Sequence, residues 1–228
     1  MPRRKGLYIA FEGGEACGKS TQARLLTERI GERALLTYEP GGTGLGARLR
    51  AILLDPATGG DMDDMTEAYL MAADRSEHMA KVVSPQIKKG GHVVSDRTFV
   101  SSLAYQGAAR GLGEQEILNL NLANTGLLTP DFMIIMGEVS AEERSIRLAA
   151  FGKPDRIEAA GRDFHTKVAE SFGRMVDTLA NDSRTESIKT VYIEQEAAGV
   201  QKDIPSLHEE ICAKLVDYCQ ETSVVCPI

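Results

Sequence analysis

Short apolar runs alternate with amphipathic segments along the chain. Runs of three to five residues bounded by turn residues or charges predict the strands of a sheet. They lie at Leu7–Phe11, Ala34–Thr37, His92–Ser95, Phe132–Met136 and Val191–Ile193. Strands that alternate with helices, without an internal repeat or a low-complexity linker, predict one α/β domain over residues 1–228 around a mostly parallel five-stranded sheet.

Apolar residues at helical spacing predict the helices between these strands. The first helix, Lys19–Ile30, ends at Gly31, a common stop signal. The longest helix, from about Thr66 to Val83, approaches Pro85, which we expect to bend or interrupt its extension toward Lys89. Other helices are predicted around Leu49–Leu53, Val100–Ala109, Glu114–Asn124, Ala141–Ala150, Phe164–Leu179 and Leu207–Tyr218.

Composition and charge exclude several classes of protein. The 228 residues are 43% hydrophobic and 26% charged, a mixture typical of a folded chain. The formal net charge of −7 disfavours a nucleic-acid binder. The first apolar run is cut short by Glu12, and no later run approaches the roughly 18 apolar residues of a membrane span. We therefore expect a soluble, cytoplasmic protein that binds neither nucleic acid nor membranes.

The cysteines and histidines show no spacing typical of a metal site. Three of the four cysteines crowd near the C-terminus, and the four histidines are scattered along the chain. We expect structural or incidental thiols, because no secreted disulfide framework has this arrangement.

A phosphate-binding motif follows the first strand. Residues 13–20 fit G-x-x-x-x-G-K-[ST] and lie between a predicted strand and a predicted helix, as the motif requires. The loop N–H groups and the helix N-terminus attract phosphate, Lys19 reaches the β- and γ-phosphates, and Ser20 binds Mg²⁺. The predicted ATP-phosphate site comprises Gly13, Gly14, Glu15, Ala16, Cys17, Gly18, Lys19, Ser20 and Thr21.

Charged residues follow two further strands. Asp96 and Arg97 lie at the end of the third strand, where parallel sheets bind ligands, so they can face a metal ion and a phosphate. A surface salt bridge is the alternative. Glu39 ends the second strand, and the helix beyond brings Arg48 and Arg50 back toward it; either arginine could instead lie on a solvated helix face.

Taken together, these segments resemble the thymidylate kinase family in its bacterial form, P-loop enzymes that phosphorylate dTMP with ATP. The resemblance follows the family's order through Phe11–Thr21, Thr37–Thr43, Ala72–His78, Asp96–Gly107 and Asp155–Phe164. Beyond about residue 180 only the strand-then-helix pattern is similar. The resemblance implies a three-layer P-loop NTPase fold with a small lid at about 144–160, ATP and dTMP as substrates, Mg²⁺ as cofactor, and a homodimer.

The resemblance also implies roles for individual residues. Asp96 helps to hold Mg²⁺ together with Ser20, and Glu15 binds the 3′-hydroxyl of the acceptor. Arg97 and Arg50 both bind the phosphate group of dTMP. The implied dTMP site comprises Glu15, Glu39, Arg50, Met71, Arg75, Arg97, Ser101, Tyr105 and Gln106. The implied catalytic residues are Lys19, Asp96, Arg97, Arg147 and Arg156.

The lid must supply a cation that the phosphate loop lacks. Some relatives place an arginine at the position of Ala16, where it neutralises the transferring phosphoryl group. The resemblance therefore assigns that charge to the lid, where Arg147 and Arg156 are the candidates, with Lys153 behind them.

Two departures from the family's pattern leave other functions open. Met71 stands where the family usually has a phenylalanine stacked on the base, and methionine is also an ordinary core residue. Tyr38 replaces the usual arginine of the second motif. The resemblance implies the reaction ATP + dTMP → ADP + dTDP. The competing functions are a kinase for another nucleoside monophosphate, a P-loop ATPase or switch protein without a nucleotide acceptor, and a non-catalytic binding protein.

Overall fold

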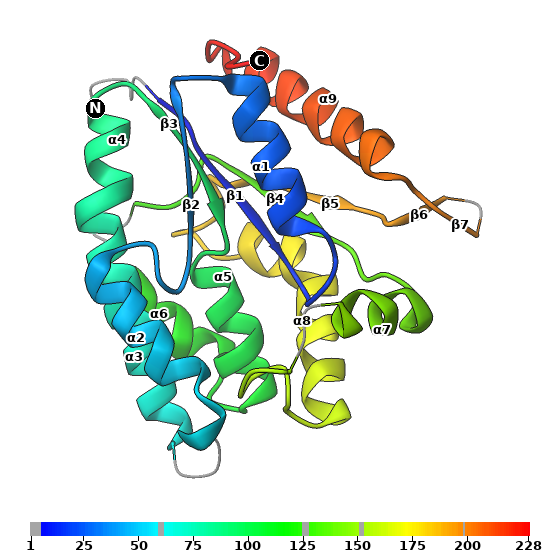
Figure 1. The fold of residues 1–228 in the computed structure, drawn as a ribbon. Helices are drawn as coiled ribbons and strands as arrows, with labels where there is room; N and C mark the ends of the chain where they lie inside the picture. Colours follow the sequence, from blue (N-terminus) through cyan, green and yellow to red (C-terminus); the bar gives the residue numbers. More distant parts are fainter. Residues whose placement is uncertain (1–5, 59–61, 125–127, 151–152, 198) are drawn as a thin grey trace.

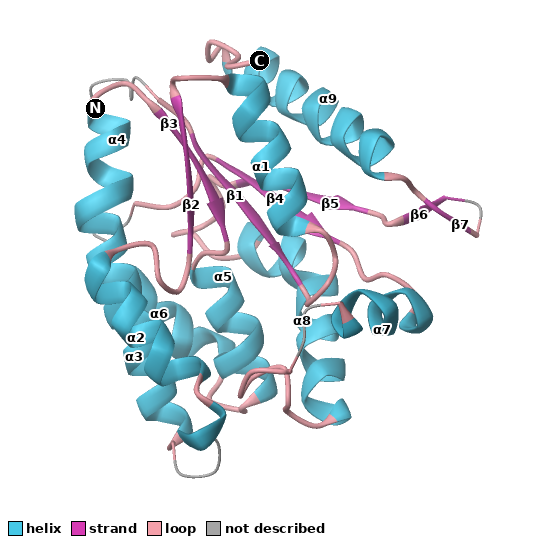
Figure 2. Ribbon diagram, viewed as in Figure 1, coloured by secondary structure: helices cyan, strands magenta, loops and turns pink. Residues whose placement is uncertain are grey.

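The central sheet contains five parallel strands in the order β2-β3-β1-β4-β5 (Figures 1 and 2). The computed structural model describes residues 6–58, 62–124, 128–150, 153–197 and 199–228. In chain order the strands are β1 (Tyr8–Gly13), β2 (Ala34–Tyr38), β3 (His92–Asp96), β4 (Phe132–Met136) and β5 (Lys189–Ile193). The predicted α/β fold with a five-stranded sheet is therefore confirmed.

Helical segments connect the strands. The α-helices are α1 (Lys19–Ile30), α2 (Gly44–Leu54), α3 (Asp64–His78), α4 (Ser84–Lys88), α5 (Phe99–Ser102), α6 (Glu114–Asn124), α7 (Ala141–Ala149), α8 (Arg162–Ala180) and α9 (Ile204–Thr222). A 3₁₀ turn, η1 (Pro56–Thr58), follows α2, and π-helical turns η2 (Met79–Val83) and η3 (Leu103–Ala109) extend α3 and α5. A short antiparallel pair, β6 (Glu196–Ala197) and β7 (Val200–Gln201), was not expected from the sequence.

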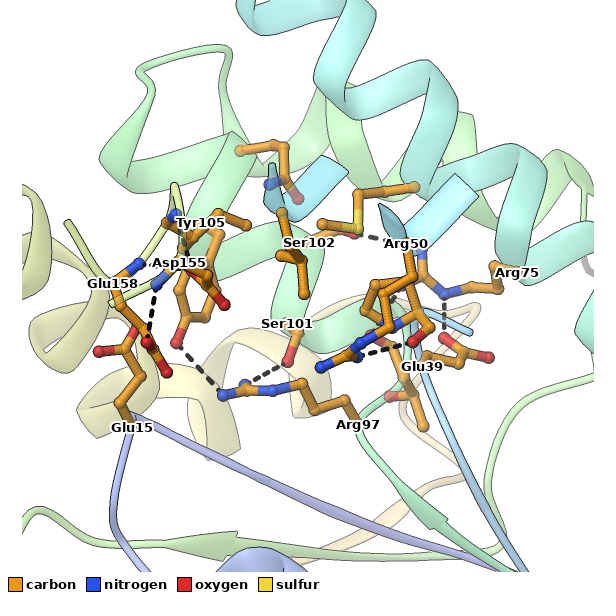
Figure 3. A pocket seen from close by; sticks show the side chains of 16 residues that line it. Glu15, Glu39, Arg50, Arg75, Arg97, Ser101, Ser102, Tyr105, Asp155 and Glu158 are labelled. Atoms are coloured by element: carbon orange, nitrogen blue, oxygen red, sulfur yellow. Dashed lines mark hydrogen bonds and ion pairs between the residues drawn. The ribbon is translucent and has the colours of Figure 1, made fainter. Parts of the chain in front are cut away.

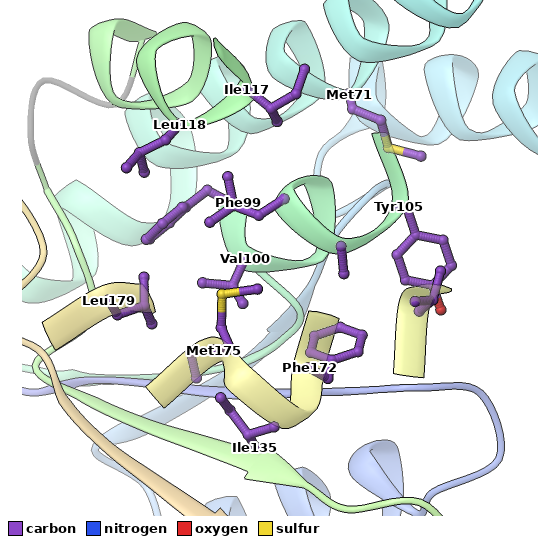
Figure 4. Packing of buried hydrophobic residues seen from close by; sticks show 14 of the residues in the cluster. Met71, Phe99, Val100, Tyr105, Ile117, Leu118, Ile135, Phe172, Met175 and Leu179 are labelled. Atoms are coloured by element: carbon purple, nitrogen blue, oxygen red, sulfur yellow. The ribbon is translucent and has the colours of Figure 1, made fainter. Parts of the chain in front are cut away.

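Helices cover both faces of the sheet and make three layers. Side chains alternate between the faces of a strand, so Ile9 and Phe11 of β1 pack with α1 and α9, whereas Ala10 faces the opposite layer. That opposite layer is built by α3, α5, α6 and α8, whose apolar side chains form the larger cluster of the core (Figure 4). The strands β1, β2 and β3 end at the same edge of the sheet, and their last residues are Gly13, Tyr38 and Asp96.

A π turn, η2, interrupts the long helix just before Pro85, whereas the sequence predicted a bend or interruption at Pro85 itself. The backbone N–H of Ser84 donates to the carbonyl of Met79, five residues earlier, and α4 begins at Ser84. Pro85 therefore lies in the first turn of α4, a position in which proline is tolerated.

Two further expectations concern cysteines and membranes. The four cysteines are free thiols, and Cys17, Cys212 and Cys219 are buried. In the part of the chain that the structure describes, no helix combines the length and the apolar character needed to cross a membrane.

Candidate active site

The phosphate loop, residues 14–18, joins β1 to α1 at the edge where the strands end (Figure 1). Gly13 and Gly18 adopt φ angles of 135° and 88°, which favour glycine. A Cβ atom at Gly13 would lie 2.5 Å from the carbonyl oxygen of Met136, so no side chain fits there. Lys19 is buried and its Nζ donates to the carbonyl of Gly14. The strand–loop–helix arrangement that the motif requires is present.

A hydroxyl and a carboxylate meet beside the loop. Asp96 pairs with Phe11 in the sheet register, which brings the end of β3 next to α1. Ser20 Oγ donates a hydrogen bond of 2.5 Å to Asp96 Oδ2. Both are the hard oxygen ligands that Mg²⁺ prefers, and an ion with few protein ligands completes its shell with water and phosphate oxygens. Among the described residues, no group of three or more His, Cys, Asp or Glu side chains forms a metal site.

Arg97 is fixed between the phosphate loop and α5. Its backbone adopts a left-handed φ of 77°. The Nη1 atom donates to the carbonyl of Gly13 at 3.0 Å and to Ser101 Oγ at 2.9 Å, and Nη2 donates to Tyr105 Oη at 3.4 Å. This guanidinium is therefore oriented before any anion arrives, and it remains protonated at all physiological pH values.

Glu12 organises this edge of the sheet, although the sequence analysis assigned it no role beyond ending the first apolar run. It is fully buried and accepts hydrogen bonds from the backbone N–H and hydroxyl of Thr98, both at 2.7 Å, and from the backbone N–H and hydroxyl of Ser101, at 3.2 and 2.6 Å. Burial raises the pKa of Glu12, while the charge of Arg97 and these hydrogen bonds oppose the rise. A charged residue inside a strand covered on both faces was the available signal.

A cavity of about 150 Å³ lies next to Arg97, between the phosphate loop and the helices α2, α3 and α5 (Figure 3). All nine residues that the resemblance assigned to dTMP line it: Glu15, Glu39, Arg50, Met71, Arg75, Arg97, Ser101, Tyr105 and Gln106. We call it the acceptor cavity. Thr98 and Ser102 also line it and were not predicted.

Arg75 is held rigidly at the wall of the acceptor cavity. Its Nε donates to Glu39 Oε2 at 2.7 Å, its Nη1 to Ser102 and Asn121, and its Nη2 to the carbonyl of Thr98 at 3.0 Å. Burial alone would raise the pKa of Glu39, but Arg75 and a neighbouring histidine outweigh it and lower the pKa. Four of the five N–H groups of Arg75 have partners among the described residues, which leaves one for a ligand.

The structure accounts for Met71 and Tyr38. Met71 lines the acceptor cavity and also belongs to the larger core cluster, so a place against the base and a place in the core are compatible. Tyr38 is half exposed, and the guanidinium of Arg50 lies 5.8 Å from the centre of its ring. Arg50 Nη1 also donates to the carbonyl of Pro40 at 2.8 Å. The tyrosine thus supports an arginine that lines the cavity, whereas Arg48 is exposed and does not line it.

A larger groove of about 1050 Å³ runs along the phosphate loop and α1. We call it the donor groove. The lining of the donor groove and of the acceptor cavity has five residues in common: Glu15, Glu39, Arg50, Arg97 and Glu158. The two spaces therefore meet beside Arg97, and ligands bound in both would face each other there.

The structure separates the candidate lid cations. Arg147 of α7 lines the donor groove, and its Nη1 donates to the carbonyl of Ala16 at 2.9 Å. Arg156 is buried elsewhere, in an ion pair of 2.5 Å with Glu67 of α3, and does not contact the phosphate loop. Lys153 is exposed and lines neither space. All three were predicted to lie near the transferring phosphoryl group. Of the three, only Arg147 contacts the phosphate loop.

Glu15 lines both spaces and has two basic neighbours that were not predicted. Its Oε2 lies 3.6 Å from Arg144 Nη2 and 3.9 Å from His165 Nδ1. These residues come from α7 and α8, so both helices contact the phosphate loop. No local sequence pattern links the three positions.

Comparison with known proteins agrees with this geometry. Residues 11–204 match the family model described as thymidylate kinase. A thymidylate kinase from Caldicellulosiruptor saccharolyticus is 44% identical over 172 residues, which cover 74% of this chain and 82% of the relative. One from Symbiobacterium thermophilum is 38% identical over 208 residues, covering 90% and 94%. The crystal structure of thymidylate kinase from Ehrlichia chaffeensis aligns with a TM-score of 0.72 at 26% identity, covering 92% of this chain and 98% of that one. With the phosphate loop, the adjoining acceptor cavity and these relatives in agreement, the chain belongs to the thymidylate kinase family.

Proposed function

We propose that the protein transfers the γ-phosphoryl group of ATP to dTMP, with ATP in the donor groove and dTMP in the acceptor cavity. The observation that carries this assignment of sites is that the two spaces meet at Arg97 and Glu15. A monophosphate near Arg97 would be adjacent to a triphosphate held by the loop. An ATPase or a switch protein without a nucleotide acceptor would leave Arg50, Arg75 and Arg97 without a common role.

In this proposal catalysis consists of positioning and charge neutralisation. The acceptor phosphate is already an anion, so no base has to remove a proton before attack. Arg97 orients the acceptor, Lys19 balances charge on the donor, and Arg147 approaches the transferring group. Ser20 and Asp96 would hold Mg²⁺, which when bound neutralises charge on the β- and γ-phosphates.

The segment of residues 144–160 acts as a lid in this proposal. Residues 151 and 152 of this segment lie outside the described part of the chain. The contacts of Arg144 and Arg147 with Glu15 and Ala16 support a lid that covers the phosphate loop. Such a cover excludes water and so prevents hydrolysis of ATP.

A homodimer in the cytoplasm completes the proposal. Apolar side chains that are 37–59% exposed lie on α2 and α3, which pack against each other, and they suit burial against a second copy. They are Leu45, Ile52, Met65 and Tyr69. Sedimentation equilibrium tests the dimer, because the mass of a single chain at micromolar concentration would contradict it. The free buried thiols suit a reducing compartment.

An acceptor panel tests the function. We expect ADP release, measured by a coupled assay, to be fastest with dTMP among dTMP, dUMP, dCMP, dGMP and AMP, and to be negligible without an acceptor. A different preferred acceptor would identify a kinase for another nucleotide. Turnover of ATP that no acceptor changes would identify an ATPase or a switch protein.

Glu15→Gln tests the 3′-hydroxyl assignment. We expect kcat/KM for dTMP to fall about 10- to 100-fold while the KM for ATP changes little, because a hydrogen bond to a charged group contributes about 1.5–3 kcal/mol. The 3′-deoxy analogue of dTMP is the control, since the native protein and the variant should use it about equally. A loss of ATP affinity with unchanged dTMP kinetics would assign Glu15 to the donor site.

A further inference from the structure

A buried ion network lies behind the acceptor cavity. At its centre is Glu67 of α3, which is only 1% exposed and does not line the cavity. Its Oε1 accepts a hydrogen bond of 2.7 Å from Gln106 Nε2. Its Oε2 lies 3.0 Å from Arg110 Nη2 and 2.5 Å from Arg156 Nη2. Two guanidinium groups and one amide therefore converge on a single carboxylate.

The network keeps this carboxylate ionised. Burial alone would raise the pKa of Glu67, but the hydrogen bonds from Gln106, Arg110 and Arg156 and the charge of Arg110 outweigh it and lower the pKa. Arg156 is fixed in turn, because its Nε donates to the carbonyl of Leu53 at 2.7 Å. An ionised carboxylate accepts hydrogen bonds and donates none.

This property fixes the orientation of the Gln106 amide. The NH₂ group must face Glu67, because the carbonyl oxygen would face a negative charge in the flipped orientation. Gln106 also lines the acceptor cavity, and no group of the described residues donates to its Oε1. The Oε1 atom of Gln106 is therefore a hydrogen-bond acceptor that is available to a ligand in the acceptor cavity.

We propose that Glu67, supported by Arg156 and Arg110, is a positioning residue that selects thymine over cytosine by holding the Gln106 amide in one orientation. Thymine carries a donor, N3–H, at the position where cytosine carries an unprotonated acceptor nitrogen. An oriented Oε1 accepts from thymine and repels cytosine, whereas a freely rotating amide satisfies both. The inference rests on the proposed placement of the base in the acceptor cavity.

The selectivity ratio of Glu67→Gln tests this inference. A glutamine at 67 can donate or accept, so Gln106 is free to turn its amide. We expect the ratio of kcat/KM for dTMP to kcat/KM for dCMP to fall at least about tenfold, the scale at which one oriented hydrogen bond discriminates between bases. The fall should come from a higher KM for dTMP, with kcat within a few-fold of the native value. This ratio does not depend on the fraction of folded enzyme.

Two further variants make the outcome unambiguous. Asp64→Asn is the matched control, because Asp64 also pairs with Arg110, at 3.3 Å, but is a part-exposed residue that does not contact Gln106. Its ratio should equal that of the native protein. Glu67→Asp keeps the charge but shortens its reach to the amide, so it should lower the ratio even if Glu67→Gln does not fold.

Gln106→Leu distinguishes failure of this inference from failure of the base placement. If Gln106→Leu lowers the ratio but both Glu67 variants leave it unchanged, the orienting role of Glu67 is wrong and the placement stands. If Gln106→Leu also leaves the ratio unchanged, the base does not bind beside Gln106, and both are wrong.

Discussion

Replacing Lys19 with alanine is expected to abolish phosphoryl transfer, with kcat at least about 10³-fold lower. Loss of a phosphate-binding cation acts on this scale, because charge on the transferring group is left without compensation. Lys19 is buried at the start of α1, and its Nζ already points into the loop toward the carbonyl of Gly14. Steady-state kinetics with saturating dTMP measure the effect.

Lys88→Ala serves as the control for charge and stability. Lys88 is an exposed lysine at the end of α4, far along the chain from the loop, and its removal should leave kcat unchanged. Circular dichroism should give the same folded spectrum for both variants. Near-normal activity in Lys19→Ala would contradict the assignment of the phosphate loop.

Replacing Arg147 with alanine is expected to lower kcat by about 10³-fold with little change in either KM. An arginine that stabilises the transition state contributes about this factor in phosphoryl transfer. It acts on kcat because the charge that it neutralises develops only in the transition state. Arg147 reaches the carbonyl of Ala16 and lines the donor groove, so a small movement brings it to the phosphates.

Two other arginine variants serve as controls for Arg147→Ala. Arg174→Ala removes an exposed arginine of α8 that pairs with Glu114, and it should leave kcat unchanged. Arg156→Ala should affect the KM for dTMP more than kcat, because Arg156 contacts Glu67 and not the loop. If Arg147→Ala keeps kcat within a few-fold of the native value, the cation comes from Arg97 or from a partner subunit.

The fold could be predicted from the sequence because its signals are local. Each strand is a short apolar run closed by a turn residue or a charge, and β4 is buried along its whole length. The phosphate loop is a contiguous motif whose neighbours are a strand and a helix. The nine residues assigned to dTMP came from resemblance, and the structure brings them together around one cavity although they span Glu15 to Gln106. Their individual roles stay predictions.

The features of the site that the sequence did not predict depend on contacts between segments that are distant along the chain. The position of Glu12 inside a buried strand marks it as unusual, but its partners Thr98 and Ser101 are known only from the structure. Arg156 was a candidate for the transition state because it lies in the lid segment, but it pairs with Glu67, on a helix much earlier in the chain. No periodicity or spacing links two charges that meet only after the sheet and helices have assembled.

The π turn η3 has a consequence for how this family can diverge. Inside a regular helix each residue adds about 100° of rotation, so one extra residue in a turn changes which side chains share a face. Tyr105 and Gln106 both lie in η3 and both line the cavity together with Ser101 and Ser102. Deletion of one residue between 103 and 109 would rotate the cavity-lining residues on one side of the deletion relative to those on the other side. A substitution in this stretch would change one side chain of the cavity at a time, whereas a change in its length would displace several of them together.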